Sequence, residues 1–217
     1  EAVKIRLTEE MEERYDIYYR VHAQNFGWMG WTKNGESAGT EGYGYRVEAI
    51  QIKIVKKGAQ APGTTEQCFS KKWTSIVYSA HVQDIGWQNN VKDGALAGTT
   101  GESKRVEAIK ISLSGQKAEG SVEYSAHVQD IGWQKSVKDG ALAGTTGKGK
   151  RVEAIKINLT GTLSESCDVY YRVHAQDHGW LGWTKNGNPA GTEGLSKRLE
   201  GIQIVLVEKG GEAPGKT

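Results

Sequence analysis

The chain has 217 residues and a formal net charge of +2, with 28 basic and 26 acidic side chains. A nucleic-acid surface needs clustered basic residues, so this near-balance gives no support for a nucleic-acid partner. No apolar run reaches the length of a membrane-spanning helix, so we expect no membrane insertion. The length allows one large domain or two small ones.

Four copies of one sequence unit fill most of the chain, at residues 19–54, 78–113, 124–159 and 171–206. The histidines that mark the register are separated by 59, 46 and 47 residues, and lie at His22, His81, His127 and His174. The longer first step reflects an insertion that contains the segment GAQAPG, and GGEAPG follows copy four. A copy of about 46 residues is too small to bury a good core alone, so neighbouring copies must share one.

The copies are of two kinds, in the order aromatic, plain, plain, aromatic. The plain copies carry SAHVQDIGWQ and VKDGALAGTTG, and the aromatic copies carry YYRVHAQ, GWxGWTKNG and AGTEG. The first seven residues, EAVKIRL, match the end of a plain copy, EAIKISL. We therefore expect the sequence to begin inside a repeat of a longer parent protein, with other modules fused to it.

Alternating apolar residues predict an all-β fold of tandem repeats, each with about four short antiparallel strands. In copy two Tyr78 and Val82 point to one face, and by parity Glu107 and Arg105 share a face with Ile109. An Asn-Gly or Asp-Gly pair recurs in every copy and predicts a tight type I′ turn. The segment 8–15 predicts one helical turn between repeats.

The repeats predict two lobes, at residues 1–66 and 67–217. Three copies in the second lobe could close with threefold symmetry, as in a β-trefoil or a β-prism. The alternative is pairwise association of copies, two in each lobe.

The recurring histidines and carboxylates give no catalytic or metal-binding pattern. No copy has a second histidine or cysteine at ligand spacing, so we expect no metal and no cofactor. A catalytic carboxylate pair occurs once per active site, whereas these Arg-x-Glu pairs occur once per repeat. We therefore expect a hydrogen-bonded structural network of His, Gln, Arg and Glu, and no enzyme activity. Cys68 and Cys167 are either two free thiols or one bridge.

The tryptophans suggest where a ligand could bind. Trp28, Trp87, Trp133 and Trp180 occur in every copy, which favours a place in the core, with a groove-lining position as the alternative. Trp31 and Trp183 occur only in the aromatic copies, where the plain copies have Asn or Ser, so they are expected to face solvent. A solvent-facing indole ringed by amides and ammonium groups suits a sugar. The predicted carbohydrate-binding residues are Trp31, Trp183, Lys33, Asn34, Lys185, Asn186, Tyr43, Trp28 and Trp180.

These segments, among them HVQDIGWQ, DGALAGTTG and RVEAIKI, resemble the clostridial hydrophobic repeats known as ChW repeats. The resemblance covers all four copies and the first seven residues. It implies an extracellular or cell-surface bacterial protein associated with glycans, adhesion or the cell wall, and it supplies no catalytic residue. We expect a non-catalytic carbohydrate-binding module that binds a polysaccharide, with a starch-like α-glucan first and cell-wall glycan second. The alternative is a structural or adhesive repeat that binds protein.

Overall fold

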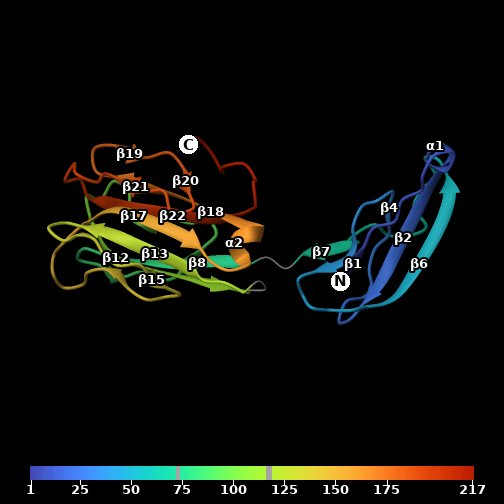
Figure 1. Cartoon of the computed structure of the whole chain (residues 1–217), viewed down its shortest axis with the longest axis horizontal. Coiled ribbons are helices and arrows are strands. Elements are labelled where there is room, and N and C mark those ends of the chain that lie inside the picture. The colour runs from blue at the N-terminus through green and yellow to red at the C-terminus, as the bar shows by residue number, and fades with distance from the viewer. Residues whose placement is uncertain (72–73, 116–118) are drawn as a thin grey trace. The chain divides into compact units, whose positions relative to one another are not determined.

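The structure is a computed structural model that describes residues 1–71, 74–115 and 119–217. It is all-β, with two short helices (Figure 1). Contacts divide the chain into a first unit, Glu1–Trp73, and a second unit, Thr74–Thr217. The sequence placed this boundary between residues 66 and 67, but a strand that lies after that point pairs within the first unit.

Each repeat contains five strands in the same order: a long strand, a Gly-Trp strand, a strand ending in Lys, an Ala-Gly strand and a long closing strand. In repeat one these are β2 (Tyr15–Ala23), β3 (Gly27–Trp28), β4 (Thr32–Lys33), β5 (Ala38–Glu41) and β6 (Val47–Lys56). In repeat two they are β8 (Ser75–Val82), β9 (Gly86–Trp87), β10 (Val91–Lys92), β11 (Ala97–Gly98) and β12 (Val106–Ser114). In repeat three they are β13 (Val122–Val128), β14 (Gly132–Trp133), β15 (Val137–Lys138), β16 (Ala143–Gly144) and β17 (Val152–Leu159). In repeat four they are β18 (Cys167–Ala175), β19 (Gly179–Trp180), β20 (Thr184–Lys185), β21 (Ala190–Gly191) and β22 (Leu199–Glu208).

Four elements lie outside this pattern: β1 (Ala2–Val3), α1 (Glu10–Arg14), β7 (Phe69–Lys71) and α2 (Leu163–Ser166). The helical turn expected within residues 8–15 is therefore confirmed as α1. Helix α2 ends the corresponding connection, directly before β18 of repeat four, and was not predicted.

The turns between the Lys strand and the Ala-Gly strand have the predicted geometry. Asn34 and Gly35 have φ angles of 49° and 91°, and the backbone N–H of Glu36 donates to Lys33 O at 3.0 Å. Positive φ at both central residues defines a type I′ turn. The Asp93-Gly94 turn has the same signs, at 44° and 89°.

The two long strands of each repeat form an antiparallel pair with a β-bulge at the recurring glutamate. In repeat two Val106 pairs with Val82 and Ala108 pairs with His81, so Glu107 is the extra residue. A bulge shifts the alternation of side chains by one position. The predicted face of Glu107 is therefore wrong: Val106 and Ile109 lie in the core, 2% exposed each, and Glu107 lies with His81 on the other side.

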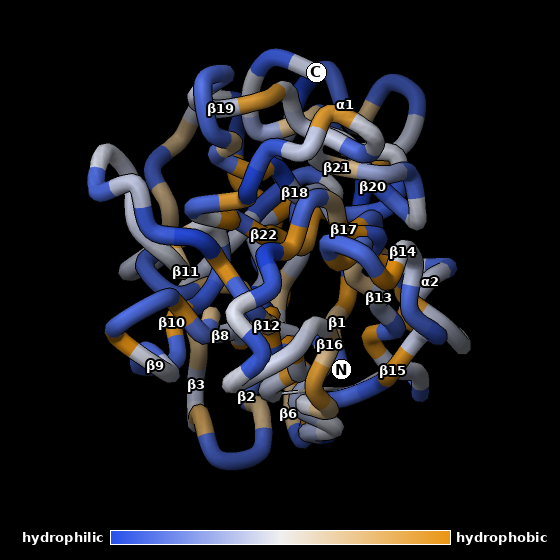
Figure 2. Tube along the Cα trace, turned by 90° about the vertical axis from the view of Figure 1, so that its left-hand side faces the viewer, coloured by the Kyte–Doolittle hydropathy of each residue, from blue (hydrophilic) through white to orange (hydrophobic). Residues whose placement is uncertain are grey.

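In the second unit each repeat passes its Ala-Gly strand to the sheet of another repeat. Strand β16 pairs with β12, β21 pairs with β17, and β11 pairs with β22, so the three exchanges form a closed ring. The inner faces of the three sheets share one core, and apolar residues follow the long strands (Figure 2). No barrel closes among the described strands, so the trefoil alternative does not apply, and three sheets around one core correspond to a prism.

Candidate functional site

The recurring tryptophan of each repeat lies at the surface and not in the core. Trp28 and Trp87 are 42% and 37% exposed, and Trp133 and Trp180 are half-buried. A two-residue strand holds each indole against the long strand of its own repeat, with Trp87 opposite His81 and Trp28 opposite His22. The core position expected for these four residues is therefore wrong, and Trp87 and Trp28 line surface hollows.

A histidine and a cation hold each indole in place. The His81 ring meets Trp87 edge-on, with ring centroids 5.4 Å apart, and Lys110 Nζ lies 4.5 Å from the centroid of the indole. Such cation–π contacts contribute roughly 0.5–1 kcal/mol at exposed sites. The same three groups recur as His22, Trp28 and Arg20; His127, Trp133 and Lys156; and His174, Trp180 and Arg172.

A buried glutamate connects the histidine to an arginine. Glu107 is 6% exposed; Arg105 Nε donates to its Oε1 at 2.9 Å, and His81 Nδ1 lies 3.2 Å from its Oε2. The His81 contact is close but is not aligned as a hydrogen bond, whereas the corresponding His22–Glu48 contact, at 3.1 Å, is aligned. The Arg–Glu hydrogen bond of the predicted network is present in all four repeats, and the His–Glu hydrogen bond is present in repeat one. The bulge makes the network possible, because it brings the glutamate to the histidine face.

In the plain repeats the glutamine that follows the tryptophan, Gln88 or Gln134, bonds to the backbone of the Ala-Gly strand rather than to the Arg-Glu pair. Gln88 accepts from Gly98 N at 2.6 Å and donates to Gly98 O at 3.2 Å, so its amide fixes the Ala-Gly strand. Gln134 makes the same pair of bonds to Gly144. The aromatic repeats have Met29 and Leu181 at this position, next to the core.

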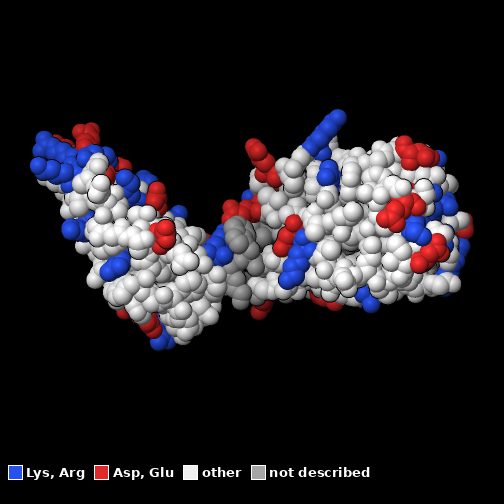
Figure 3. Space-filling view, turned by 180° about the vertical axis from the view of Figure 1, so that it is seen from behind, with Lys and Arg blue, Asp and Glu red and all other residues white. Residues whose placement is uncertain are grey.

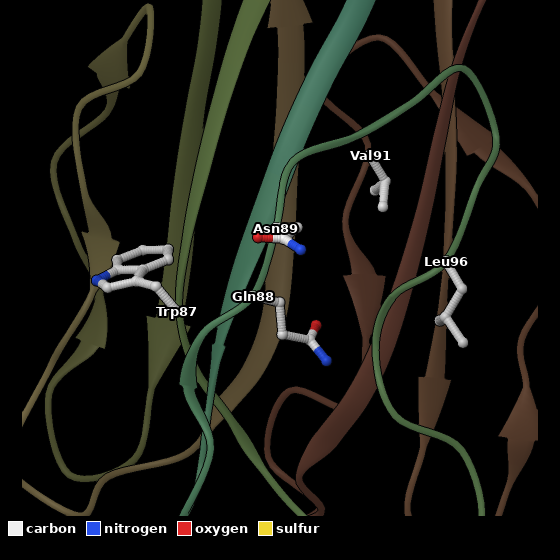
Figure 4. A pocket seen from close by; sticks show the side chains of 5 residues that line it. All are labelled: Trp87, Gln88, Asn89, Val91 and Leu96. Carbon is white, nitrogen blue, oxygen red and sulfur yellow. The ribbon is translucent and has the colours of Figure 1, made fainter.

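An open groove of about 460 Å³ lies beside Trp87 and is lined by Trp87, Gln88, Asn89, Val91 and Leu96 (Figure 4). The indole stands at one side of the groove, and Val91 and Leu96 lie across from it. Asn89 is exposed between them. The groove thus combines a flat aromatic surface, an amide and an apolar wall.

A second hollow, of about 290 Å³, lies beside Trp28 in the first unit. Its lining includes Phe26, Trp28 and Gln67. Phe26 meets Tyr43 edge-on at 5.2 Å, and Tyr43 stacks on Tyr45 at 5.4 Å. Tyr43, one of the predicted site residues, therefore belongs to an aromatic cluster that adjoins this hollow through Phe26.

Trp31 and Trp183 do not face solvent: they are 8% and 7% exposed. The segment after each aromatic repeat folds back over the indole, and Trp183 N donates to Lys216 O at 2.9 Å while Trp31 N donates to Thr64 O at 2.8 Å. The equivalent residues of the plain repeats, Asn90 and Ser136, are exposed as expected. The prediction failed for the aromatic copies because only they are followed by this covering segment.

The polar residues predicted to surround those indoles are engaged in structural contacts. In the first unit Asn34 Nδ2 donates to Asp16 Oδ1 at 2.8 Å, and Lys33 lies 3.8 Å from Asp16 Oδ2. In the second unit Asn186 and Lys185 contact Asp168 at 2.8 and 3.0 Å. The packing thus covers the indoles at the centre of both predicted sugar sites, whereas Trp28 and Trp180 lie nearer the surface.

These contacts lower the pKa values of the two aspartates. The hydrogen bond from the Asn34 amide, followed by the one from Gly58 N, lowers the pKa of Asp16 from 3.8 to about 2. Burial alone would raise the pKa of Asp168, but hydrogen bonds from Asn186, Lys209, Lys185 and Gly210 outweigh it and lower that pKa well below 3.8. Each aspartate thus connects the Asn-Gly turn of its repeat to the Lys-Gly pair that directly follows the closing strand.

Other chemical groups form no further site in the part of the chain that the structure describes. No cluster of three potential metal ligands occurs among the described residues. No helix there is long and apolar enough to cross a membrane. Cys68 and Cys167 are both free thiols. Lys, Arg, Asp and Glu are interspersed on the face shown in Figure 3.

The fold and the surface together define a tandem-repeat all-β protein with one supported indole per repeat. The family model for ChW, described as Clostridial hydrophobic W, matches four times, at residues 22–56, 81–115, 127–161 and 174–208. These matches cover more than half of the chain, and the chain belongs to the ChW family. No curated protein and no solved structure matches it.

Proposed function

We propose that this chain is a non-catalytic carbohydrate-binding module of an extracellular or cell-surface bacterial protein. The recurring, exposed indoles are its binding surfaces, and Trp28, Trp87, Trp133 and Trp180 replace Trp31 and Trp183 as the central residues. The family supports a glycan-associated role, since ChW repeats accompany such modules in bacterial surface proteins.

The observation that carries the proposal is the groove beside Trp87 (Figure 4). The C–H face of a pyranose can lie on an indole, while amides such as Asn89 bond its hydroxyl groups. Lys110, His81 and Glu107 hold the indole before any ligand arrives, so binding does not require ordering of the side chain. A contact of roughly 100 Å² of apolar surface would give about 2.5 kcal/mol, which makes one site weak.

Four weak sites on one chain suit a polymer. When one indole is engaged, the next meets the same polysaccharide at a high effective concentration. A starch-like α-glucan is the first choice, because its curved chain can pass from one repeat to the next around a threefold unit. Cell-wall glycan is the second choice.

A structural or adhesive function, with protein as the ligand, is the alternative. Ile85 lies two residues before Trp87 and is 48% exposed, and Leu96 in the groove is 37% exposed. Exposed aliphatic side chains near the indole favour protein contact over sugar contact. The two functions differ in the side chain on which affinity depends. Sugar binding depends on the ring of Trp87, and protein binding depends on aliphatic side chains such as Ile85.

Affinity electrophoresis in gels that contain amylose, pullulan, cellulose or soluble peptidoglycan tests the proposal. We expect retardation by α-glucan, at least a threefold loss of affinity in Trp87→Ala, and a smaller change in Ile85→Ala. Retardation by none of the glycans would reject the carbohydrate-binding function. Release of reducing sugar from any of them would reject the non-catalytic part.

A further inference from the structure

The outer edge of the closing strand is exposed in the first unit. The equivalent edge is covered in all three repeats of the second unit. In the second unit the outer edge of every closing strand receives the Ala-Gly strand of another repeat. In the first unit the closing strand β6 pairs with β2, and no described strand lies on its other edge. Figure 1 shows β2 and β6 as the long hairpin of this unit.

Three kinds of contact define a covered edge. At the β12 edge, Gly140 N donates to Ile111 O at 2.7 Å, and Thr145 N donates to Glu107 O at 2.8 Å. Ile111 N donates to the hydroxyl of Tyr124, which comes from the same donor repeat, at 3.0 Å. The other two edges repeat the pattern, with Ile157 N bonded to Tyr171 and Ile204 N bonded to Tyr78.

The first unit already contains one such junction, formed by its N-terminal strand. Ala2 pairs with Gly39, as Ala108 pairs with Gly144. Gly35 N donates to Ile5 O at 2.8 Å, and Thr40 N donates to Glu1 O at 2.9 Å. Strand β1 therefore occupies the position of a closing strand, and the Ala-Gly strand of repeat one is already in use.

Isoleucine side chains of β6 are exposed where the equivalent isoleucines of repeat four are buried. Ile50, Ile52 and Ile54 are 43%, 52% and 48% exposed. In repeat four the residues equivalent to Ile50 and Ile52 are Ile202 and Ile204, which are 3% and 0% exposed. Both strands carry the sequence Ile-Gln-Ile, so β6 offers the same chemistry as a surface that is fully buried elsewhere in the chain.

We propose that the open face of β6 is the docking site for a further plain ChW repeat, which inserts its Ala-Gly-Thr strand and its tyrosine. The plain kind is indicated because the equivalent aromatic strand, β22, receives β11 from a plain repeat. The donor must have a free Ala-Gly strand, and the four Ala-Gly strands described here are all paired. Together with a second repeat that ends in the β1 strand, the donor would complete a threefold unit like Thr74–Thr217. This inference is independent of sugar binding.

The chain itself provides the donor for a test. Residues 1–7 align with residues 153–159, so a copy of residues 74–152 can be placed directly before Glu1. The extended chain then supplies two plain repeats in the order found in the second unit. We expect hydrogen exchange at the Ile52 amide to slow by roughly a hundredfold or more, because edge amides exchange by local fluctuation and core-strand amides do not.

Two variants separate docking from general stabilisation. Gly98→Val, made in the added copy, should restore fast exchange at Ile52, because a Cβ at Gly98 lies 2.3 Å from Glu200 O at the equivalent junction. Ile52→Lys should leave the stability of the original chain nearly unchanged, since this side chain is 52% exposed, and should destabilise the first unit of the extended chain.

Equal exchange at Ile52 in the original and extended chains would overturn the proposal. So would protection of Ile52 in the original chain that rises with concentration together with a doubled mass, because the face would then belong to a second copy.

Discussion

Replacing Trp183 by Ala should destabilise the second unit without removing a binding surface. The indole is 7% exposed, and its Nε1 would lie 3.2 Å from a Cβ at Gly215, so it is packed against the backbone of the covering segment. Truncation of a buried Trp costs about 3–5 kcal/mol. For a domain of this size each kcal/mol lowers the melting temperature by roughly 2–4 °C, which gives a decrease of about 6–20 °C.

The matched control is Trp87→Ala in the same unit. Its indole is 37% exposed and is held by one histidine edge and one lysine, so its loss should cost about 1 kcal/mol. Thermal unfolding followed by circular dichroism measures the stability of both variants, and affinity electrophoresis measures their binding. A Trp183→Ala protein that melts like the parent but no longer binds polysaccharide would refute the assignment of the outer indoles as the site.

Two substitutions and one titration test the hydrogen bonds and the burial that stabilise the fold. The pKa of Asp16 is lowered in the folded state, so its contribution is present above pH 3.8 and is lost as the pH falls toward about 2; Asp16→Asn should remove this part of the acid dependence of unfolding in denaturant. Tyr78→Phe leaves Ile204 N without its acceptor and should cost about 1–3 kcal/mol in urea unfolding. Burial raises the pKa of Tyr78 and of Tyr171 to about 12, and it also raises the pKa of Tyr124, so titration at 295 nm should show a late-ionising group that contains these three tyrosines.

The alternation of apolar residues was sufficient to predict the long hairpins and the tight turns. Tyr78, Ala80 and Val82 are all buried, as their spacing indicates, and the Asn-Gly and Asp-Gly pairs form the expected turns. The bulge was missed, although the sequence contains a signal for it: the apolar positions change parity between Val106 and Ile109. Reading a single parity through Glu107 assigned its side chain to the wrong face.

The tryptophans were misassigned because recurrence was taken as a sign of burial. A residue present in every repeat can also be part of a repeated surface, and here the His-Glu-Arg network holds that surface together. The co-occurrence of Trp31 and Tyr18 with a following Ala-Pro-Gly segment could have indicated a packing pair. Tyr18 donates to Ala59 O at 3.2 Å, and Tyr170 donates to Gly211 O at 3.2 Å, so both aromatic residues contact that segment.

The exchange of Ala-Gly strands explains why the repeats are of two kinds. A plain repeat gives its Ala-Gly strand to one neighbour, receives one on its closing strand, and continues directly into the next copy. Repeat four, an aromatic repeat, makes the same exchange, whereas the closing strand of repeat one receives no described strand. After both aromatic repeats the chain folds back over its own repeat. The extra Tyr and Trp provide this attachment, because Tyr170 and Trp183 bind the segment that follows β22. The aromatic repeat four thus closes the threefold unit Thr74–Thr217, and the proposed docking at β6 would give the aromatic repeat one the same position in a second unit.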